Sequence, residues 1–304
     1  MGYRLLYGLF YVLSLLPFSV LYVIADGFYL IVYHLVGYRR RVVRRNLTLS
    51  FPEMSLNEIK KTEKAFYHWL CDYFMETVKL LSISDRQLAK HLEFRGAEQI
   101  EQCFDKGQAC AAMLGHYCNW EYLSATGIAM TRWERAVMGL IYHPLRNKVF
   151  DRLFIAIREK HGGTCIPKKD ILRRLVEYRR SGSMSLFGYI ADQSPKWENI
   201  HLFLPFMHQD TPVFTGAERI IRKMNNAVFY VHMERPSRGK YVCTFELMTD
   251  RPQEMEEYEL TKDFFVRLER NIQEQPAFYL WTHDRWKRTR EVYDRKVAAG
   301  EIRG

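Results

Sequence analysis

The chain has 304 residues, which is long enough for one sizeable catalytic domain and an anchor. Hydrophobic residues make up 48% and charged residues 26% of the chain, a balance that argues against a disordered protein. The formal net charge of +10 predicts attraction to a polyanion, either nucleic acid or an anionic membrane.

The N-terminal segment is apolar. Residues 5–25 carry no charged side chain, and as a helix these 21 residues would be roughly 31 Å long, about the thickness of the bilayer hydrocarbon core. After Asp26 the apolar and aromatic pattern continues to Tyr38. Pro17 leaves two arrangements open, a single kinked span or a hairpin that enters the membrane and returns. The alternative, an apolar helix buried in a soluble core, is disfavoured by the length of the segment and by its basic flank.

A basic cluster follows this segment and consists of Arg39, Arg40, Arg41, Arg44 and Arg45. The positive-inside rule places such a cluster, and the domain behind it, on the cytoplasmic face of a membrane. Each basic residue near an anionic leaflet adds about 1 kcal/mol of attraction. We therefore expect residues 1–45 to form a membrane anchor with a basic juxtamembrane segment, and residues 46–304 to form one catalytic domain.

The catalytic domain is predicted to begin with a long helix over residues 56–81. Ser55 and Glu58 have the spacing of a capping box, in which each side chain bonds the backbone N–H of the other residue. Short apolar runs then predict strands over residues 109–114, 137–142, 184–190, 228–231 and 241–245.

Helical patterns separate these strands. They cover residues 122–130, 146–159, 171–180, 217–224 and 262–273. Strands that alternate with helices predict an α/β fold, with a mixed or largely parallel central sheet flanked by helices.

The clearest chemical signal lies at the end of the strand predicted over residues 109–114. The strand leads into Gly115 and His116, and Glu121 follows five positions after the histidine. Five residues turn a regular helix by about 500°, so the two side chains meet only if His116 precedes the helix and Glu121 points back to it. A histidine can take the proton of a hydroxyl that attacks an acyl carbon, and a carboxylate on its other ring nitrogen fixes the tautomer. The pattern thus predicts a general base, His116, oriented by Glu121.

Two other interpretations of this motif remain open. Cys118 could be a thiol nucleophile served by His116, or His116 could merely bond a backbone carbonyl at the strand end. The six cysteines lie without any C-x-x-C pair, which predicts free thiols. The histidines show no metal-ligand spacing, so neither a metal nor a cofactor is expected.

Further blocks of sequence surround the motif in a fixed order. They are Tyr38 to Glu53, Tyr142-His143-Pro144-Leu145, Ile190-Ala191-Asp192-Gln193, Phe203-Leu204-Pro205-Phe206, Thr215-Gly216 and Tyr279 to Lys287. Together with strand-Gly-His-x4-Glu, and over almost the whole chain, they resemble the bacterial lipid A biosynthesis (lauroyl/myristoyl) late acyltransferase family. That family belongs to the wider H-x4-D/E glycerolipid acyltransferase group.

The resemblance implies an enzyme that transfers a fatty acyl group from acyl carrier protein, or from coenzyme A, to a hydroxyl of a lipid A precursor at the cytoplasmic face of the inner membrane. It also implies that a basic residue and an aspartate accompany the catalytic pair in substrate binding. The matching positions are Lys168, with Lys169 beside it, and Asp192. The family more often carries an arginine where Lys168 stands, and a lysine keeps the charge but lacks the planar fork.

Other functions use the same residues differently. The acceptor could instead be an aminolipid, a glycosylated phosphatidylinositol or a lysophospholipid, since acceptor choice depends on pocket shape. A non-catalytic protein that binds an anionic membrane surface is a third possibility, although it would have no use for an oriented base. Nucleic acid is not an expected partner, because no helix-turn-helix, finger or RNP pattern is present.

A basic and aromatic cluster near the C-terminus has two interpretations. It consists of Trp281, His283, Arg285, Trp286, Lys287 and Arg288. It could contact lipid headgroups or an acidic carrier protein, or it could be part of an exposed terminal helix.

Overall fold

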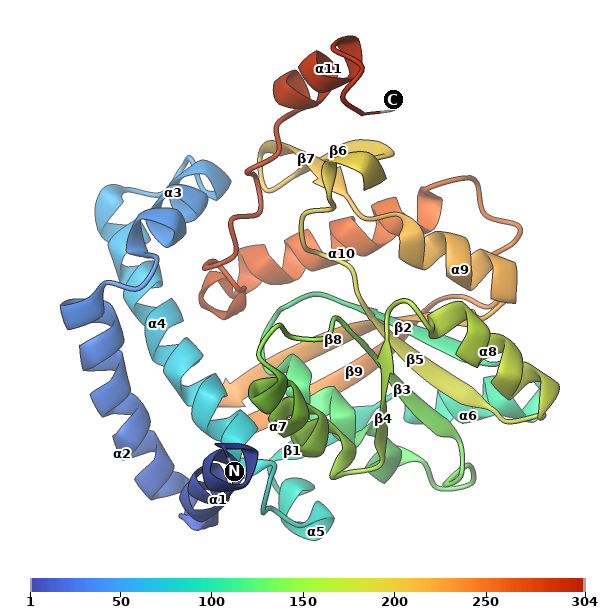
Figure 1. Ribbon diagram of the computed structural model, residues 1–304, viewed down its shortest axis with the longest axis horizontal. Helices are drawn as coiled ribbons and strands as arrows, with labels where there is room; N and C mark the ends of the chain where they lie inside the picture. Colours follow the sequence, from blue (N-terminus) through green and yellow to red (C-terminus); the bar gives the residue numbers. More distant parts are fainter. Residues whose placement is uncertain (1, 303–304) are drawn as a thin grey trace.

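The computed structural model describes residues 2–302, and a seven-stranded mixed sheet lies at its centre (Figure 1). Its strands are β1 (Leu92–Arg95), β2 (Cys110–Leu114), β3 (Val137–Tyr142), β4 (Gly163–Pro167), β5 (Ser185–Ile190), β8 (Ala227–Ser237) and β9 (Lys240–Thr249). Their order across the sheet is β1-β9-β8-β2-β5-β3-β4. All neighbours from β8 to β4 pair in parallel, whereas β9 is antiparallel to β8.

Helices pack against the sheet, and several more stand beside it (Figure 1). They are α1 (Gly2–Leu15), α2 (Phe18–Tyr29), α3 (Arg40–Ser50), α4 (Leu56–Lys79), α5 (Asp85–Leu88), α6 (Ala97–Asp105), α7 (Lys148–Glu159), α8 (Ile171–Arg180), α9 (Gly216–Met224), α10 (Glu259–Glu274) and α11 (Arg290–Ala298). In Figure 1 the blue helices α2 and α3 and the cyan helix α4 stand beside the sheet, and α11 extends away from it.

Short helical turns and a hairpin complete the structure. These are η1 (Leu30–Val36), η2 (Trp120–Ala129), η3 (Trp197–Asn199), η4 (Pro276–Phe278) and the antiparallel strands β6 (Leu202–Phe206) and β7 (Gln209–Val213).

The predicted α/β fold with a mixed sheet is confirmed, and each of the five predicted strands is present. The capping box at the start of α4 is also present: Ser55 Oγ accepts from Glu58 N at 3.3 Å, and Glu58 Oε2 accepts from Ser55 N at 2.8 Å. The helix predicted over residues 122–130 is instead the 3₁₀ helix η2. Its hydroxyls explain the tighter winding, because those of Ser124 and Thr126 donate to carbonyls three residues earlier.

Pro17 divides the N-terminal apolar segment. Helix α1 ends at Leu15, and a new helix runs through α2 and the π-helical η1 until Gly37, whose φ of 61° ends it. Within residues 2–302, the stretch Phe18–Val36 is the one helix long and apolar enough to cross a membrane, with a mean hydropathy of 1.7. The candidate for a membrane span therefore lies further along the chain than the expected residues 5–25.

The first 45 residues also pack against the domain that follows. Leu21 and Ala25 of α2 and Val43 of α3 are buried in the same apolar cluster as Phe66 of α4 and Phe187 of β5. Only 22% of the window in Phe18–Val36 is buried, so α2 turns one narrow side to α4 and leaves apolar side chains exposed on the rest. The N-terminal helices are thus docked on the domain by one face.

Candidate active site

The site forms where two neighbouring parallel strands end. Strands β2 and β5 pair in register, Leu114 with Ile190, so their carboxyl ends meet at one edge of the sheet. The chain continues from β2 into His116 and from β5 into Asp192. Nδ1 of His116 lies 2.7 Å from Oδ1 of Asp192. Such an edge is the usual place for functional side chains in open α/β sheets.

Asp192 holds the imidazole ring in one tautomer. Its carboxylate is only 1% exposed. Burial opposes its ionisation, but the charge and hydrogen bond of His116 and the charge of Arg285 outweigh burial and lower the pKa of Asp192. An ionised carboxylate can only accept, so Nδ1 carries the ring proton and Nε2 keeps a lone pair. The amide of Gln193 lies 3.2 Å from Nε2 and donates to it.

Glu121 points elsewhere, and the predicted contact between Glu121 and His116 is wrong. In the described part of the chain Glu121 makes no hydrogen bond to the ring, because Asp192 takes Nδ1 and Gln193 takes Nε2. Glu121 lies in the first turn of η2 and faces α7. There Arg158 binds it through two bonds, Nε to Oε2 at 2.8 Å and Nη2 to Oε1 at 2.6 Å.

The Glu121–Arg158 pair is well shielded from water, with 4% and 22% of the two side chains exposed. Burial disfavours the charged guanidinium, but Glu121 more than compensates and raises the pKa of Arg158. Arg158 was not among the residues that the sequence singled out. Its only signal was its place beside the buried Ile157 near the end of an amphipathic helix.

The predicted substrate-binding residues fall into two groups. Asp192 is buried against His116, so its carboxylate orients the ring instead of offering an open binding surface. Lys168 and Lys169 follow β4 and are exposed. Because β3 and β4 are parallel to β5 and β2, both lysines lie at the same edge of the sheet as His116. Neither forms an ion pair within residues 2–302.

The C-terminal segment holds the loop that carries His116. Leu280 N donates to the carbonyl of His116 at 3.1 Å, and Cys118 N donates to the carbonyl of Phe278 at 2.8 Å. The basic and aromatic cluster is therefore not an exposed terminal helix, since Trp281 and Arg285 are 0% and 1% exposed. Burial of these residues holds the ends of the loop that carries His116 against the core.

A second histidine from this segment stands near the site. His283 Nε2 accepts from Ser194 N at 3.4 Å. Burial is the main cause that lowers the pKa of His283, to about 4, and the nearby charges of Lys287 and Arg285 add to it. The His283 ring is therefore neutral at physiological pH.

Cys118 does not have the setting of a nucleophile. Its side chain is 0% exposed, and burial raises the pKa of the thiol far above its ordinary value. Its backbone adopts a φ of 52°, in the left-handed region. The thiol interpretation is therefore not supported. Gly115 is required for packing, because a Cβ there would lie 2.7 Å from Cδ1 of Leu268 on α10.

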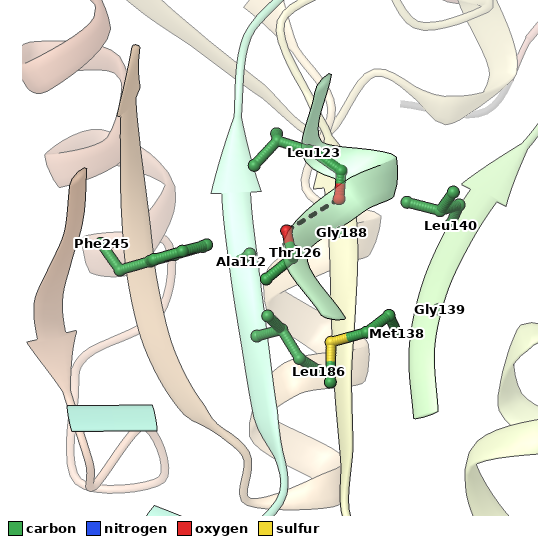
Figure 2. Close-up of a pocket in the computed structure, with 9 residues that line it drawn as sticks. All are labelled: Ala112, Leu123, Thr126, Met138, Gly139, Leu140, Leu186, Gly188 and Phe245. Atoms are coloured by element: carbon green, nitrogen blue, oxygen red, sulfur yellow. Dashed lines mark hydrogen bonds between the residues drawn. The ribbon is translucent and has the colours of Figure 1, made fainter. Parts of the chain in front are cut away.

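An apolar cavity lies under η2, between strands β2, β3 and β5 (Figure 2). Figure 2 shows Leu123 and Thr126 of η2 on one side of it, and Gly139 and Gly188 line it from the strands. Its free volume is about 20 Å³, space for about one water molecule and far less than an acyl chain needs. Among residues 2–302 no group of three His, Cys, Asp or Glu side chains could hold a metal ion.

Comparison with known proteins gives a consistent result. The family model of the bacterial lipid A biosynthesis acyltransferases matches residues 2–288. The lipid A biosynthesis lauroyltransferase of Escherichia coli is 24% identical over 283 residues, which cover 92% of this chain and 89% of that protein. A lipid A biosynthesis acyltransferase of Haemophilus influenzae is 23% identical over 92% of this chain and 89% of its own length. A match over nearly the whole chain, with an oriented histidine at the sheet edge, means that the protein belongs to the bacterial lipid A biosynthesis acyltransferase family and is an acyltransferase.

Proposed function

We propose that His116, oriented by Asp192, is the general base for acyl transfer from a thioester to a hydroxyl of a lipid A precursor. The observation that carries this proposal is the 2.7 Å hydrogen bond between the Asp192 carboxylate and Nδ1 of His116, which leaves Nε2 as the basic nitrogen. The substrate hydroxyl would replace the Gln193 amide that donates to Nε2. Nε2 takes the hydroxyl proton as the oxygen attacks the acyl carbon. The ester forms, the carbon–sulfur bond breaks, and the imidazolium returns the proton to the leaving thiolate.

Glu121 acts in this scheme through Arg158. The two bonds between them use Nε and Nη2 of the guanidinium, so Nη1 remains for a substrate oxygen. A guanidinium fixed in this way is suited to stabilise the negative charge that develops on the acyl carbonyl oxygen. We therefore assign Glu121 a positioning role, as the residue that holds Arg158 in place.

The substrates follow from the family and from the charge at the sheet edge. The exposed Lys168 and Lys169 would bind phosphate groups of the lipid acceptor, as point charges. The donor would be acyl carrier protein, an acidic partner suited to a chain with a net charge of +10. The similar Escherichia coli protein is named a lauroyltransferase, which supports a long-chain saturated acyl group here too.

The reaction would take place at the cytoplasmic face of the inner membrane, with the helix Phe18–Val36 in contact with lipid. The basic cluster contributes less to attachment than its sequence predicts. Arg39 bonds the carbonyl of Thr282, and Arg44 and Arg45 pair with Glu63 and Asp284. Attachment would then rest chiefly on the apolar surface of the N-terminal helices.

The test is acyl transfer by the purified full-length protein in detergent. A lipid A precursor with a free 3-hydroxyacyl hydroxyl is incubated with one of two donors, acyl carrier protein or coenzyme A, each carrying the same acyl group. The masses of the lipid products are then measured by mass spectrometry. The expected result is an acceptor heavier by one acyl group, with acyl carrier protein as the better donor. Acylation of a lysophospholipid but not of the lipid A precursor would overturn the acceptor assignment, and transfer only from coenzyme A would overturn the donor assignment.

A further inference from the structure

A fully buried carboxylate connects two parts of the molecule that are far apart in sequence. Glu76 on α4 is 0% exposed. It accepts hydrogen bonds from Asn119 Nδ2 at 2.8 Å, from Tyr241 Oη at 2.6 Å and from Tyr22 Oη at 2.9 Å. We infer that Glu76 is a positioning residue through which helix α2 sets the geometry of the loop from His116 to Glu121, an inference that rests on the proposed function.

One end of this connection lies inside the catalytic motif. Asn119 is 0% exposed and stands between His116 and Glu121. It follows Cys118, whose backbone has a left-handed φ of 52°. A residue other than glycine rarely adopts this conformation unless its surroundings impose it. The bond from Asn119 to Glu76 is such a constraint. Trp120, the next residue, lies edge to face with the His116 ring at 5.1 Å between centroids.

The other end lies on α2. Tyr22 donates to the same carboxylate, and its ring lies under the guanidinium of Arg238 at 4.5 Å. Arg238 Nη2 also bonds Oδ1 of Asp26 at 2.6 Å and Oδ1 of Asp72 at 2.6 Å. Asp72 is buried on α4 one turn before Glu76. Charged groups of α2, α4 and the turn between β8 and β9 thus fix the position at which Tyr22 meets Glu76.

This arrangement has a functional meaning because α2 belongs to the apolar helix that is long enough to cross a membrane. If the helix were only an anchor, it would need no bond to a carboxylate that also holds the catalytic loop. Loss of a partner leaves Glu76 with an unmet acceptor site in the core, and the loop then loses part of its restraint. Small displacements of catalytic groups reduce turnover strongly, on the order of a hundredfold for 1 Å.

The first variant is Tyr22→Phe, which removes only the hydroxyl that bonds Glu76. Activity is measured on the full-length enzyme in detergent with saturating lipid acceptor, so that recruitment to a membrane does not contribute. We expect kcat to fall about tenfold while KM for donor and acceptor changes less than about twofold, because the loop and not the binding surface is affected. The matched control is Tyr11→Phe on α1, whose side chain is 39% exposed, and it keeps wild-type kcat.

The second variant displaces Tyr22 without changing any member of the hydrogen-bond network. A Cβ at Gly239, in the turn between β8 and β9, would overlap the Tyr22 hydroxyl. Gly239→Ala should therefore lower kcat in the same way. Gly239 has a φ of +76°, so the control must carry equal backbone strain, and Gly107→Ala does, with a φ of +74° and open space around it. The control keeps wild-type kcat.

Melting temperatures of all four variants are recorded. The kcat values are then compared at a temperature well below the lowest melting temperature. The direct variant Glu76→Gln is included if it folds. Wild-type kcat for both Tyr22→Phe and Gly239→Ala, or a loss that melting alone accounts for, would overturn the positioning role. The proposed general base is tested separately in the same assay by His116→Ala: activity of that variant would overturn the proposed function, whereas the Tyr22 and Gly239 variants test only the positioning role.

Discussion

Arg158 and Glu121 illustrate how a single residue pair can serve both stability and chemistry. The pair is almost enclosed, so each charge depends on the other for the solvation that water would have provided. Removal of one partner leaves the other charge unpaired in a medium of low polarity. Tyr73 lies 3.4 Å from the same carboxylate and adds only a long hydrogen bond.

Arg158→Gln should therefore destabilise the protein by about 3 kcal/mol and abolish most activity, because it leaves a buried carboxylate unpaired. The double variant Arg158→Gln with Glu121→Gln should recover much of the stability and none of the activity. Arg295→Gln on α11 is the control, since its pair with Glu291 is exposed on both sides, and it should change stability by less than about 0.5 kcal/mol. Denaturation curves and turnover on the same samples check this, and equal losses for Arg158→Gln and Arg295→Gln would contradict it.

The lowered pKa of His283 predicts that the free energy of unfolding decreases in acid. Its pKa in the folded protein is about 4, below the 6.5 of an exposed histidine. Between these values the unfolded chain binds a proton and the folded protein does not, so stability falls as the pH drops from about 6.5 to about 4. The loss from this residue is at most about 3 kcal/mol, since part of the ring is in contact with solvent.

His283→Gln should remove that part of the acid sensitivity. Glutamine keeps an acceptor for Ser194 N and does not titrate. Melting temperatures at pH 7.5 and pH 5 should differ less in this variant than in the wild type. His201→Gln, at an exposed position, should leave the difference unchanged. An unchanged difference in His283→Gln would mean that the ring is protonated in the folded state.

At the scale of elements, the N-terminal helices combine a docked face with an exposed apolar face. Val23 on α2 is 70% exposed although its neighbours Leu21 and Ala25 are buried. An exposed apolar surface of this kind, on a helix that Asp26 and Tyr22 fix to the domain, is suited to contact lipid from the side.

Val23→Lys should weaken membrane association without unfolding the protein, because the new charge would have to leave water on binding. Val266→Lys on α10 is the matched control, since Val266 is 67% exposed and lies outside the N-terminal segment. Flotation of the two variants with anionic vesicles compares them. Equal flotation of Val23→Lys and wild type would show that this face of α2 does not contact lipid.

Local patterns in the sequence were sufficient to predict many of the helices and strands. The capping box at Ser55 and the alternation of apolar runs with amphipathic helices predict α4 and the central strands. The hairpin of β6 and β7 was missed because Pro205 and Pro212 lie within its strands, and proline is a poor strand residue.

The site was only partly predictable for a different reason. His116 follows from the strand and glycine before it, but its partner Asp192 is 76 residues away and reaches it through the order of β2 and β5 in the sheet. The spacing of His116 and Glu121 favoured a local pair. The order of the strands cannot be read from this spacing. It places His116 next to Asp192 and Glu121 next to Arg158, each a residue of another element.

At the scale of the whole molecule, the sheet edge that carries His116 is held by segments from both ends of the chain. The strands provide His116 and Asp192, α7 provides Arg158, and the C-terminal segment near Leu280 fixes the loop backbone. Figure 1 shows α4 between the N-terminal helices and the sheet, where Glu76 bonds both.

The central claim is that His116 takes the proton of a lipid hydroxyl, and the most direct measurement is the rate of acyl transfer by purified His116→Ala. The imidazole lies at the surface of the core, with 19% of its side chain exposed, so the variant should fold and melt like the wild type. The transfer rate of His116→Ala should fall by at least about a thousandfold under conditions that saturate both substrates. A folded His116→Ala protein with a transfer rate close to that of the wild type would contradict it.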